Sequence, residues 1–512
     1  MKKLLLLSIL VCMTLLSACE KTSDTTSAVN ITNSGAEANI ETSIEKDEEV
    51  SKTCRISFGE SIVDIDFAND RTTHEPSMLT SEKEIVVTVG DYSGYEIHFD
   101  GELIEPNSQF KYKIDRLSKD YFLVISYENI NTREKGEQYI ATLPYAVRDY
   151  NVISNVSDGV YYYAHEGYAF KTNHEGKIIF YYRDDTEGAR YINEFKKVSV
   201  KGKDYYLITA QKTSHEYPSL GTGAGPNAKV IILDENYNEC NVISELGKTN
   251  RTAEGIPLDQ HDFIMLDEDH YILMGYLPVL ATNLPNDVPH DVTGSRVVAA
   301  VIQEVVDDEV IFEWYSTDYP ELYNLKSDLE DYYNKKSVWF DYMHINSFDI
   351  DPDDNNFICS FRTCDTMMKI DRKTGDIIWK LSGVGDDFGL TEYQKTSKQH
   401  DFRKIGKNKY SVYDNGFDKN QTRIVEYTID EENKKLIEFN EYFIKGMYSP
   451  FQGNAQHIEE QRWLIGGGMW QSASQAFFYD VDFSSNQILF EVIPQVGQNS
   501  YDMVYRAYRF DD

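Results

Sequence analysis

The chain has 512 residues, 41% of them hydrophobic, and a formal net charge of −35. That length exceeds a typical single domain and predicts one large domain with a smaller one. The acidity argues against nucleic acid as a partner, because phosphate binding requires a basic surface, and is typical of a soluble surface outside the cell. The 37 tyrosines and 25 phenylalanines favour strands.

The N-terminus has the pattern of an export signal. Two lysines precede a short apolar run that ends in Leu16-Ser17-Ala18-Cys19. This pattern resembles a bacterial lipobox and predicts a signal peptide over residues 1–18. Cys19 would then be lipidated and anchor an extracytoplasmic protein to the bacterial membrane. The alternative is an ordinary secretory signal, in which Cys19 is incidental.

Residues 19–54 are rich in Thr, Ser, Asn and acidic residues, with few large apolar side chains, and predict a disordered tether. Residues 55–145 contain short alternating or apolar runs, at 84–89, 95–101 and 121–128, separated by turn signals. These runs predict a small N-terminal β-sandwich-like domain.

A repeating pattern starts after residue 146. Its clearest unit has apolar runs at 344–351, 357–362, 367–371 and 377–381, with turn residues at each corner. This pattern predicts four antiparallel strands in a meander. The unit recurs after His261, His400 and His457 at a spacing of about 55 residues, with insertions. We therefore predict an all-β fold, with a six-bladed β-propeller of four-stranded blades over residues 146–512.

Propeller geometry gathers separate histidines at one place. The first strand of each blade lines the central channel, and the end of the second strand lies beside the start of the first. Arg362 should therefore neighbour His344, and Asn415 should neighbour His400. The residues predicted at one mouth of the channel are His261, His344, Asn346, Arg362 and His400.

These groups together predict an anion site that contains a potential nucleophile. Other interpretations stay open: the histidines could bond an adjacent blade, and Arg362 could pair with a nearby Asp. Three histidines could also bind a metal, although an arginine beside them argues against a cation. We expect no metal. Cys359 and Cys364 could form a disulfide or remain free thiols.

The stretch from His344 to Gly383, the segment Gln399-His400-Asp401-Phe402 followed by 410–416, and the segment 261–266 resemble the bacterial arylsulfate sulfotransferase family. The resemblance implies that His400 becomes sulfurylated. It also implies that His261, His344, Asn346 and Arg362 bind the transferring group. We take Asn415 and His457 as further substrate-binding candidates, His457 because the family has a contact from its last blades.

This resemblance implies transfer of a sulfuryl group from a phenolic sulfate ester to a phenolic acceptor by a ping-pong mechanism. Neither a cofactor nor a nucleotide sulfate donor is expected. The spacing between the motifs is compressed relative to the family. The alternatives are a non-catalytic surface-lipoprotein propeller that binds a ligand or protein, and a sulfatase that transfers to water. The sequence leaves the oligomeric state open, a homodimer included.

Overall fold

The computed structural model describes most of the chain after residue 49. The described ranges are 50–58, 61–69, 73–74, 84–113, 122–141, 147–152, 159–165, 167–176, 178–183, 189–212, 228–325, 332–334, 339–469, 476–494 and 503–511. The predicted signal peptide, Cys19 and nearly all of the predicted tether lie outside these ranges. Within them, no helical segment has the length and hydrophobicity of a membrane span.

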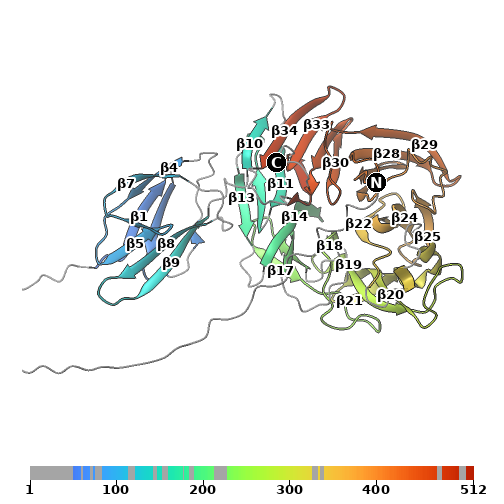
Figure 1. Cartoon of the computed structure of the whole chain (residues 1–512), viewed down its shortest axis with the longest axis horizontal. Coiled ribbons are helices and arrows are strands. Elements are labelled where there is room, and N and C mark those ends of the chain that lie inside the picture. The colour runs from blue at the N-terminus through green and yellow to red at the C-terminus, as the bar shows by residue number, and fades with distance from the viewer. Residues whose placement is uncertain are drawn as a thin grey trace, which may run out of the picture. The chain divides into compact units, whose positions relative to one another are not determined.

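The fold is all-β, and its first part consists of two sheets (Figure 1). One sheet has the order β2-β1-β4-β7 and the other the order β3-β9-β8-β5-β6. Their strands are β1 (Thr53–Phe58), β2 (Ser61–Asp66), β3 (Thr73–His74), β4 (Glu84–Val89), β5 (Tyr95–Phe99), β6 (Glu102–Ile104), β7 (Gln109–Lys113), β8 (Phe122–Asn129) and β9 (Lys135–Ala141). Ile56 and Val87 from one sheet and Ile97 and Ile125 from the other are buried in a single hydrophobic cluster.

The rest of the described chain forms six larger antiparallel sheets and one two-stranded ribbon. The first two of these sheets and part of the last use β10 (Val147–Val152), β11 (Gly159–His165), β12 (Tyr168–Thr172), β13 (Ile178–Arg183), β14 (Ala189–Val200), β15 (Lys203–Lys212), β16 (Ala228–Leu233) and β17 (Glu239–Ile243). The next two sheets are β18 (Phe263–Asp267), β19 (His270–Ala281), β20 (Ser295–Val306) and β21 (Glu309–Tyr315), then β22 (Ile345–Ile350), β23 (Phe357–Phe361), β24 (Thr366–Ile370) and β25 (Ile377–Leu381).

The last strands are β26 (His400–Gly406), β27 (Lys409–Asp414), β28 (Arg423–Asp430), β29 (Lys435–Tyr442), β30 (Asn454–Glu459), β31 (Arg462–Gly466), β32 (Gly468–Met469), β33 (Phe478–Asp482), β34 (Gln487–Pro494), β35 (Met503–Val504) and β36 (Ala507–Asp511). Short 3₁₀ turns occur at η2 (Ser316–Asp318), η3 (Pro320–Asn324), η4 (Tyr332–Asn334) and η5 (Arg362–Cys364). The meander predicted from residue 344 is confirmed, because β22 to β25 pair antiparallel in sequence order.

The two ends of this region exchange strands. The C-terminal strand β36 pairs with β11, so that Gly159 lies opposite Asp511. Strand β10 pairs with β34 in the last sheet. Each end of the region therefore completes a sheet formed mainly by the other end, which closes the series of sheets on itself.

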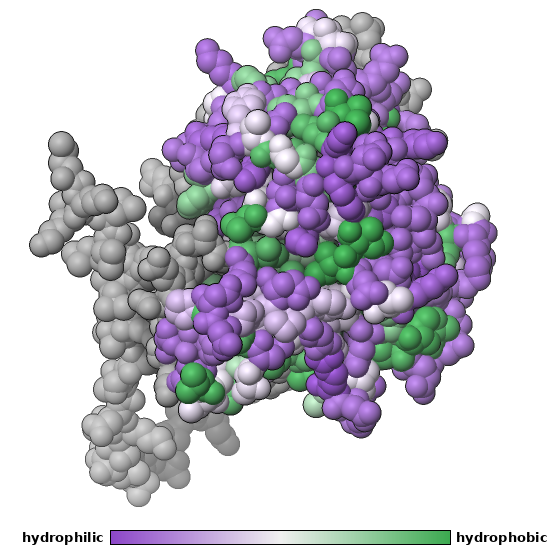
Figure 2. Space-filling model, turned by 90° about the vertical axis from the view of Figure 1, so that its right-hand side faces the viewer, coloured by the Kyte–Doolittle hydropathy of each residue, from purple (hydrophilic) through white to green (hydrophobic). Residues whose placement is uncertain are grey.

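Apolar side chains between neighbouring sheets hold the series together. Trp379 of β25, for example, is fully buried in a cluster with Phe402 of β26 and Tyr410 of β27. Burying a large aromatic side chain away from water contributes about 2 to 3 kcal/mol. Figure 2 shows the outer surface on one side as mostly hydrophilic, with hydrophobic side chains in separate small groups. The core thus lies between adjacent sheets.

The four cysteines of the described chain are all free thiols. Cys54, Cys359 and Cys364 are buried, and Cys240 is exposed. Cys364 points toward the Met343 sulfur, 3.6 Å away, and does not reach Cys359. In this structure the two neighbouring thiols of β23 and η5 form no disulfide.

Candidate functional site

The structure brings together both residue pairs that hairpin geometry predicts. The Arg362 backbone N–H donates to the His344 carbonyl oxygen at 2.7 Å. His400 Nδ1 lies 2.7 Å from Asn415 Oδ1. Each pair joins the start of a first strand to the residues that follow the second strand of the same sheet, because the two strands run antiparallel.

Asn415 determines which nitrogen of His400 carries a proton. Its amide nitrogen donates to the carbonyl oxygens of Ser449 at 2.8 Å and of Gln452 at 2.9 Å, so its Oδ1 faces the imidazole. An amide oxygen only accepts hydrogen bonds, so His400 Nδ1 must be the protonated nitrogen. The lone pair is then on Nε2, which accepts from the Gln452 N–H at 3.3 Å. This tautomer is the one that a nucleophilic Nε2 requires.

His400 is also held in its neutral form. Burial lowers the pKa of His400 well below its usual range, and the nearby positive charge of Arg362 lowers it further. The hydrogen bond to Asn415 opposes this shift without reversing it. A buried neutral imidazole can attack an electrophile at physiological pH when the electrophile takes the place of the Gln452 N–H at the Nε2 lone pair.

His261 and His344 face each other across the site. Their Nε2 atoms lie 3.4 Å apart, and both side chains are buried. His344 Nδ1 lies 2.6 Å from Asp341 Oδ2, and His261 Nδ1 bonds Asp259 in the same way. Because a carboxylate accepts from each Nδ1–H, both Nε2 atoms can share a hydrogen bond only when one of them is protonated. This geometry allows the two imidazoles to share one proton between their Nε2 atoms.

Arg362 carries a positive charge that forms no close ion pair, although the carboxylates of Asp365 and Asp341 act on it from further away. In the described part of the chain, no acidic oxygen lies within 4 Å of its guanidinium, and its buried Nε has no hydrogen-bond partner. Its Nη2 donates weakly to the Pro450 carbonyl at 3.4 Å, and its guanidinium lies 4.7 Å from the Phe451 ring centre. Burial lowers the pKa of Arg362. A half-buried arginine with unused donors is a site for an anion.

Asn346 is fully buried beside these groups. Its amide nitrogen donates to the Gln399 carbonyl at 2.7 Å, which leaves Oδ1 without a partner. Its backbone oxygen accepts from Arg506 Nη2 at 3.0 Å. In this orientation the free atom is an acceptor, so Asn346 suits a hydroxyl donor better than a sulfonate oxygen.

His457 lies apart from the other candidate residues. It is on β30, and its Nε2 donates to the Glu460 carbonyl at 3.0 Å. It lines a cavity of about 650 Å³ with Lys404 and Lys407, which lie at the far end of β26 from His400. The structure therefore does not bring His457 to the other histidines.

Two features of the site were not predicted from the sequence. The carboxylates behind the histidine pair have a sequence signal, since Asp259 precedes His261 by two residues and Asp341 precedes His344 by three. The segment 448–453 has no such signal, although its backbone contacts His400, Asn415 and Arg362. In the described ranges, no group of three or more His, Cys, Asp or Glu residues is arranged to hold a metal ion.

Comparison with known proteins gives a family for this arrangement. A family model described as "Arylsulfotransferase (ASST)" matches residues 203–482, more than half of the chain. This range contains β15 to β33 and every site residue described above except the Arg506 contact. No curated protein matches the chain.

Solved structures similar to this chain are distant. A protein of unknown function from Bacteroides caccae has 11% identity and a TM-score of 0.38, over 70% of this chain and all of its own. Apo AztD from Citrobacter koseri has 7% identity and a TM-score of 0.32, over 69% of this chain and 98% of its own. The Cps50 (Swd1) β-propeller domain from Myceliophteria thermophila has 10% identity and a TM-score of 0.28, over 62% and 95%.

Proposed function

Because this chain belongs to the arylsulfotransferase family, we propose that it transfers a sulfuryl group from a phenolic sulfate ester to a phenolic acceptor. One observation carries the proposal. A buried, neutral His400 presents its Nε2 lone pair next to the unbalanced positive charge of Arg362. A nucleophile and an anion-binding donor in one place are what sulfuryl transfer requires.

We also propose that the six larger sheets are the blades of a six-bladed propeller and that the two N-terminal sheets form a sandwich. The pairing of β36 with β11 supports a closed ring, because a ring needs a joint between its ends. The shared cluster of buried residues supports the sandwich.

In the first half-reaction, His400 Nε2 attacks the sulfur of the aryl sulfate. The Nε2–S bond forms, the bond from sulfur to the aryl oxygen breaks, and the phenolate leaves. The proton held between His261 and His344 goes to this phenolate, whose reference pKa is about 10 if it behaves like tyrosine. His400 keeps its Nδ1 proton, which stays hydrogen-bonded to Asn415.

The sulfuryl oxygens gain negative charge as the aryl oxygen leaves. Arg362 supplies a permanent positive charge and an unused Nε–H for them. The Gln452 backbone N–H, which points at Nε2, supplies a second donor next to the reacting sulfur. Donors fixed before the reaction stabilise the transition state without the cost of reorganisation.

In the second half-reaction, an acceptor phenol attacks the same sulfur. Its proton goes to the histidine pair, the Nε2–S bond breaks, and His400 returns to its starting state. Donor and acceptor use one site in turn, which predicts ping-pong kinetics. No step uses a nucleotide donor or a metal ion.

The covalent step can be tested by mass spectrometry. The protein is mixed with nitrophenyl sulfate without acceptor, and peptides are mapped for one added SO₃ group. We expect the label on His400 and none in the His400→Gln variant, while His457→Gln serves as a matched control and keeps it. A labelled His400→Gln protein would contradict the proposal.

An acceptor-dependence assay separates the alternatives. A transferase releases nitrophenol rapidly only when phenol is added, and a sulfatase releases it in water at the same rate. A binding propeller without catalysis releases none. We expect turnover to rise with phenol concentration and the sulfurylated phenol to accumulate in equal amount.

The site would face the outside of the cell if Cys19 carries a lipid. We propose this anchor from the sequence pattern at residues 16–19. Cys19→Ser should release the protein from the membrane fraction with its specific activity unchanged. Sedimentation of the active protein will also show whether it is a homodimer.

A further inference from the structure

The segment 448–453 is the part of the site that comes from outside the histidine motifs. It lies between β29 and β30, and three of its residues form hydrogen bonds with site residues. Pro450 and Ser449 accept from Arg362 and Asn415, and Gln452 contacts both Asn415 and His400. The segment therefore lies directly against the nucleophile and the anion-binding arginine.

The backbone of this segment is held in place. The Phe451 carbonyl accepts from the Met469 N–H at 3.0 Å and from Ser449 Oγ at 2.6 Å. The Gly453 N–H donates to the Tyr505 carbonyl at 3.1 Å. Gly453 has a φ of +97°, and the Tyr413 ring fills the place where a Cβ would be. Only glycine fits this turn, which fixes the direction of the preceding residues.

Phe451 projects from this rigid segment with 41% of its surface exposed. The centre of its ring lies 4.7 Å from the Arg362 guanidinium. Tyr448, three residues earlier, is half-buried and close enough to Arg362 for that charge to act on its phenol. Burial raises the pKa of Tyr448 and the Arg362 charge opposes the shift. Two aromatic side chains thus lie near the Arg362 guanidinium.

We propose that Phe451 is the wall against which the aromatic ring of the substrate packs, with Tyr448 beside it. This inference rests on the proposed function and names the group that makes it selective for aryl sulfates. When Arg362 holds the sulfuryl group of an aryl sulfate, the ring is attached to the sulfur through one oxygen atom and lies within reach of a side chain that covers the same guanidinium. An exposed phenylalanine on a pinned backbone loses little conformational entropy when a ring packs on it.

The proposal separates two contributions to binding. Arg362 recognises the sulfonate, whatever group is attached to it, and Phe451 recognises the ring. Alkyl and aryl sulfonates should therefore bind Arg362 equally and differ in their contact with Phe451. Neither compound can be turned over, because the carbon–sulfur bond is not cleaved, so binding is measured apart from catalysis.

The experiment measures the Kd of the full-length protein for benzenesulfonate and for methanesulfonate by calorimetry. We expect the wild type to bind benzenesulfonate more tightly. Phe451→Ala should raise the Kd for benzenesulfonate by about 10-fold, which is the effect of losing one aromatic contact. It should raise the Kd for methanesulfonate by less than about 2-fold. Phe443→Ala is the matched control, because Phe443 is 53% exposed and outside the site, and should change neither Kd.

Phe451→Tyr should keep the preference for the aryl compound, and Phe451→Leu should lose most of it. The proposal would be overturned if Phe451→Ala raised the Kd for both compounds equally, or if it changed neither Kd. If the wild type does not prefer benzenesulfonate, the aryl wall is absent, whether or not His400 becomes sulfurylated. Missing label on His400 with an intact aryl preference would instead reject the catalytic proposal alone.

Discussion

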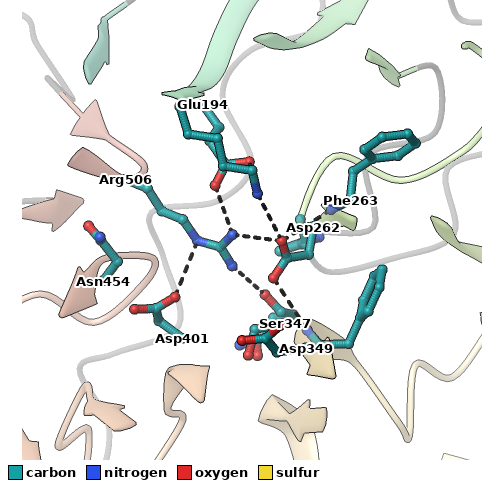
Figure 3. A network of polar contacts seen from close by, with 12 residues as sticks. Glu194, Asp262, Phe263, Ser347, Asp349, Asp401, Asn454 and Arg506 are labelled. Carbon is teal, nitrogen blue, oxygen red and sulfur yellow. Dashed lines mark hydrogen bonds and ion pairs between the residues drawn. The ribbon is translucent and has the colours of Figure 1, made fainter. Parts of the chain in front are cut away.

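The surroundings of Arg506 and of Arg362 differ in their ion-pair partners. Arg506 lies within 4 Å of acidic oxygens of Glu194, Asp262 and Asp401, in what we call the central network (Figure 3). Arg403 bonds Asp262 at 2.6 Å and Asp401 at 2.9 Å. Both arginines of this central network thus have at least two carboxylate partners.

Among the described residues, Arg362 has no carboxylate within ion-pair distance. The aspartates that follow His261 and His400 in sequence bond into the central network instead, through Asp262 with Arg506 and Arg403 and through Asp401 with Arg403. Burying a charge without a partner costs free energy, so a fold keeps one only where something else compensates. We infer that the paired Arg506 stabilises the fold and that the unpaired Arg362 serves to bind an anion.

The largest expected effect is on stability, from the central network. Arg506→Met removes the cation shared by three carboxylates and leaves them buried together. We expect the free energy of unfolding to fall by about 3 to 5 kcal/mol, measured by denaturant titration. Lys248→Met, which removes an exposed pair with Glu254, should leave the free energy of unfolding nearly unchanged. Equal losses would mean that the central charges are not a network.

Arg362→Met should affect the reaction rate and leave the stability unharmed. It removes a desolvated charge that has no partner to leave behind, so the stability should stay the same or rise. The rate of His400 sulfurylation should fall by about 10³-fold, as for other donors to a developing negative charge. A large loss of stability with unchanged single-turnover kinetics would reverse the assignment of the two arginines.

Asp341→Asn tests the histidine pair with a smaller effect. The amide no longer requires a proton on His344 Nδ1, so the pair holds its proton less well. Transfer from phenyl sulfate should fall by about 10²-fold, because its leaving group needs the proton. Transfer from nitrophenyl sulfate, whose leaving group is more acidic, should fall much less. Asp318→Asn at the surface is the control, and equal losses for both donors would indicate a structural role.

The smallest effect is the pH dependence of stability that His400 contributes. Its pKa is well below 6.5 in the folded protein and about 6.5 when unfolded, so the unfolded chain binds more protons below pH 6.5. Stability contributed at neutral pH is therefore lost as the pH falls from 6.5. When the pH falls from 7.5 to 5.5, the free energy of unfolding of His400→Gln should decrease by about 1 kcal/mol less than that of the wild type, in matched unfolding titrations. A parallel pH profile would mean that His400 is not buried in its neutral form.

Much of the fold was predictable because turn residues and strand periodicity are local. Between residues 344 and 381, the predicted strands match β22 to β25 to within about a residue at most ends, since the turns at Asn355 and Gly375 adopt positive φ. The strand exchange between β11 and β36 was not predictable, because their pairing partners are more than 300 residues apart and neither sequence specifies the other.

Some site residues were likewise predictable from local sequence, and others were not. His344 with Arg362 and His400 with Asn415 follow from hairpin geometry, which a sequence reader can apply. His457 matched the repeat equally well, yet it lies at the other end of its sheet beside Glu460. A repeat position indicates the strand on which a residue lies, but the register of that strand decides which end of the channel it reaches.

By itself, the sequence determined the all-β character, the repeating four-stranded unit, the family resemblance and the histidines worth considering, because these depend on residues close together in the chain. Only the tertiary structure decided which arginine is left unpaired, which nitrogen of His400 carries the lone pair, and that Phe451 covers Arg362. Each of these depends on hydrogen bonds and charges between segments tens to hundreds of residues apart, and such contacts are set by how the sheets pack.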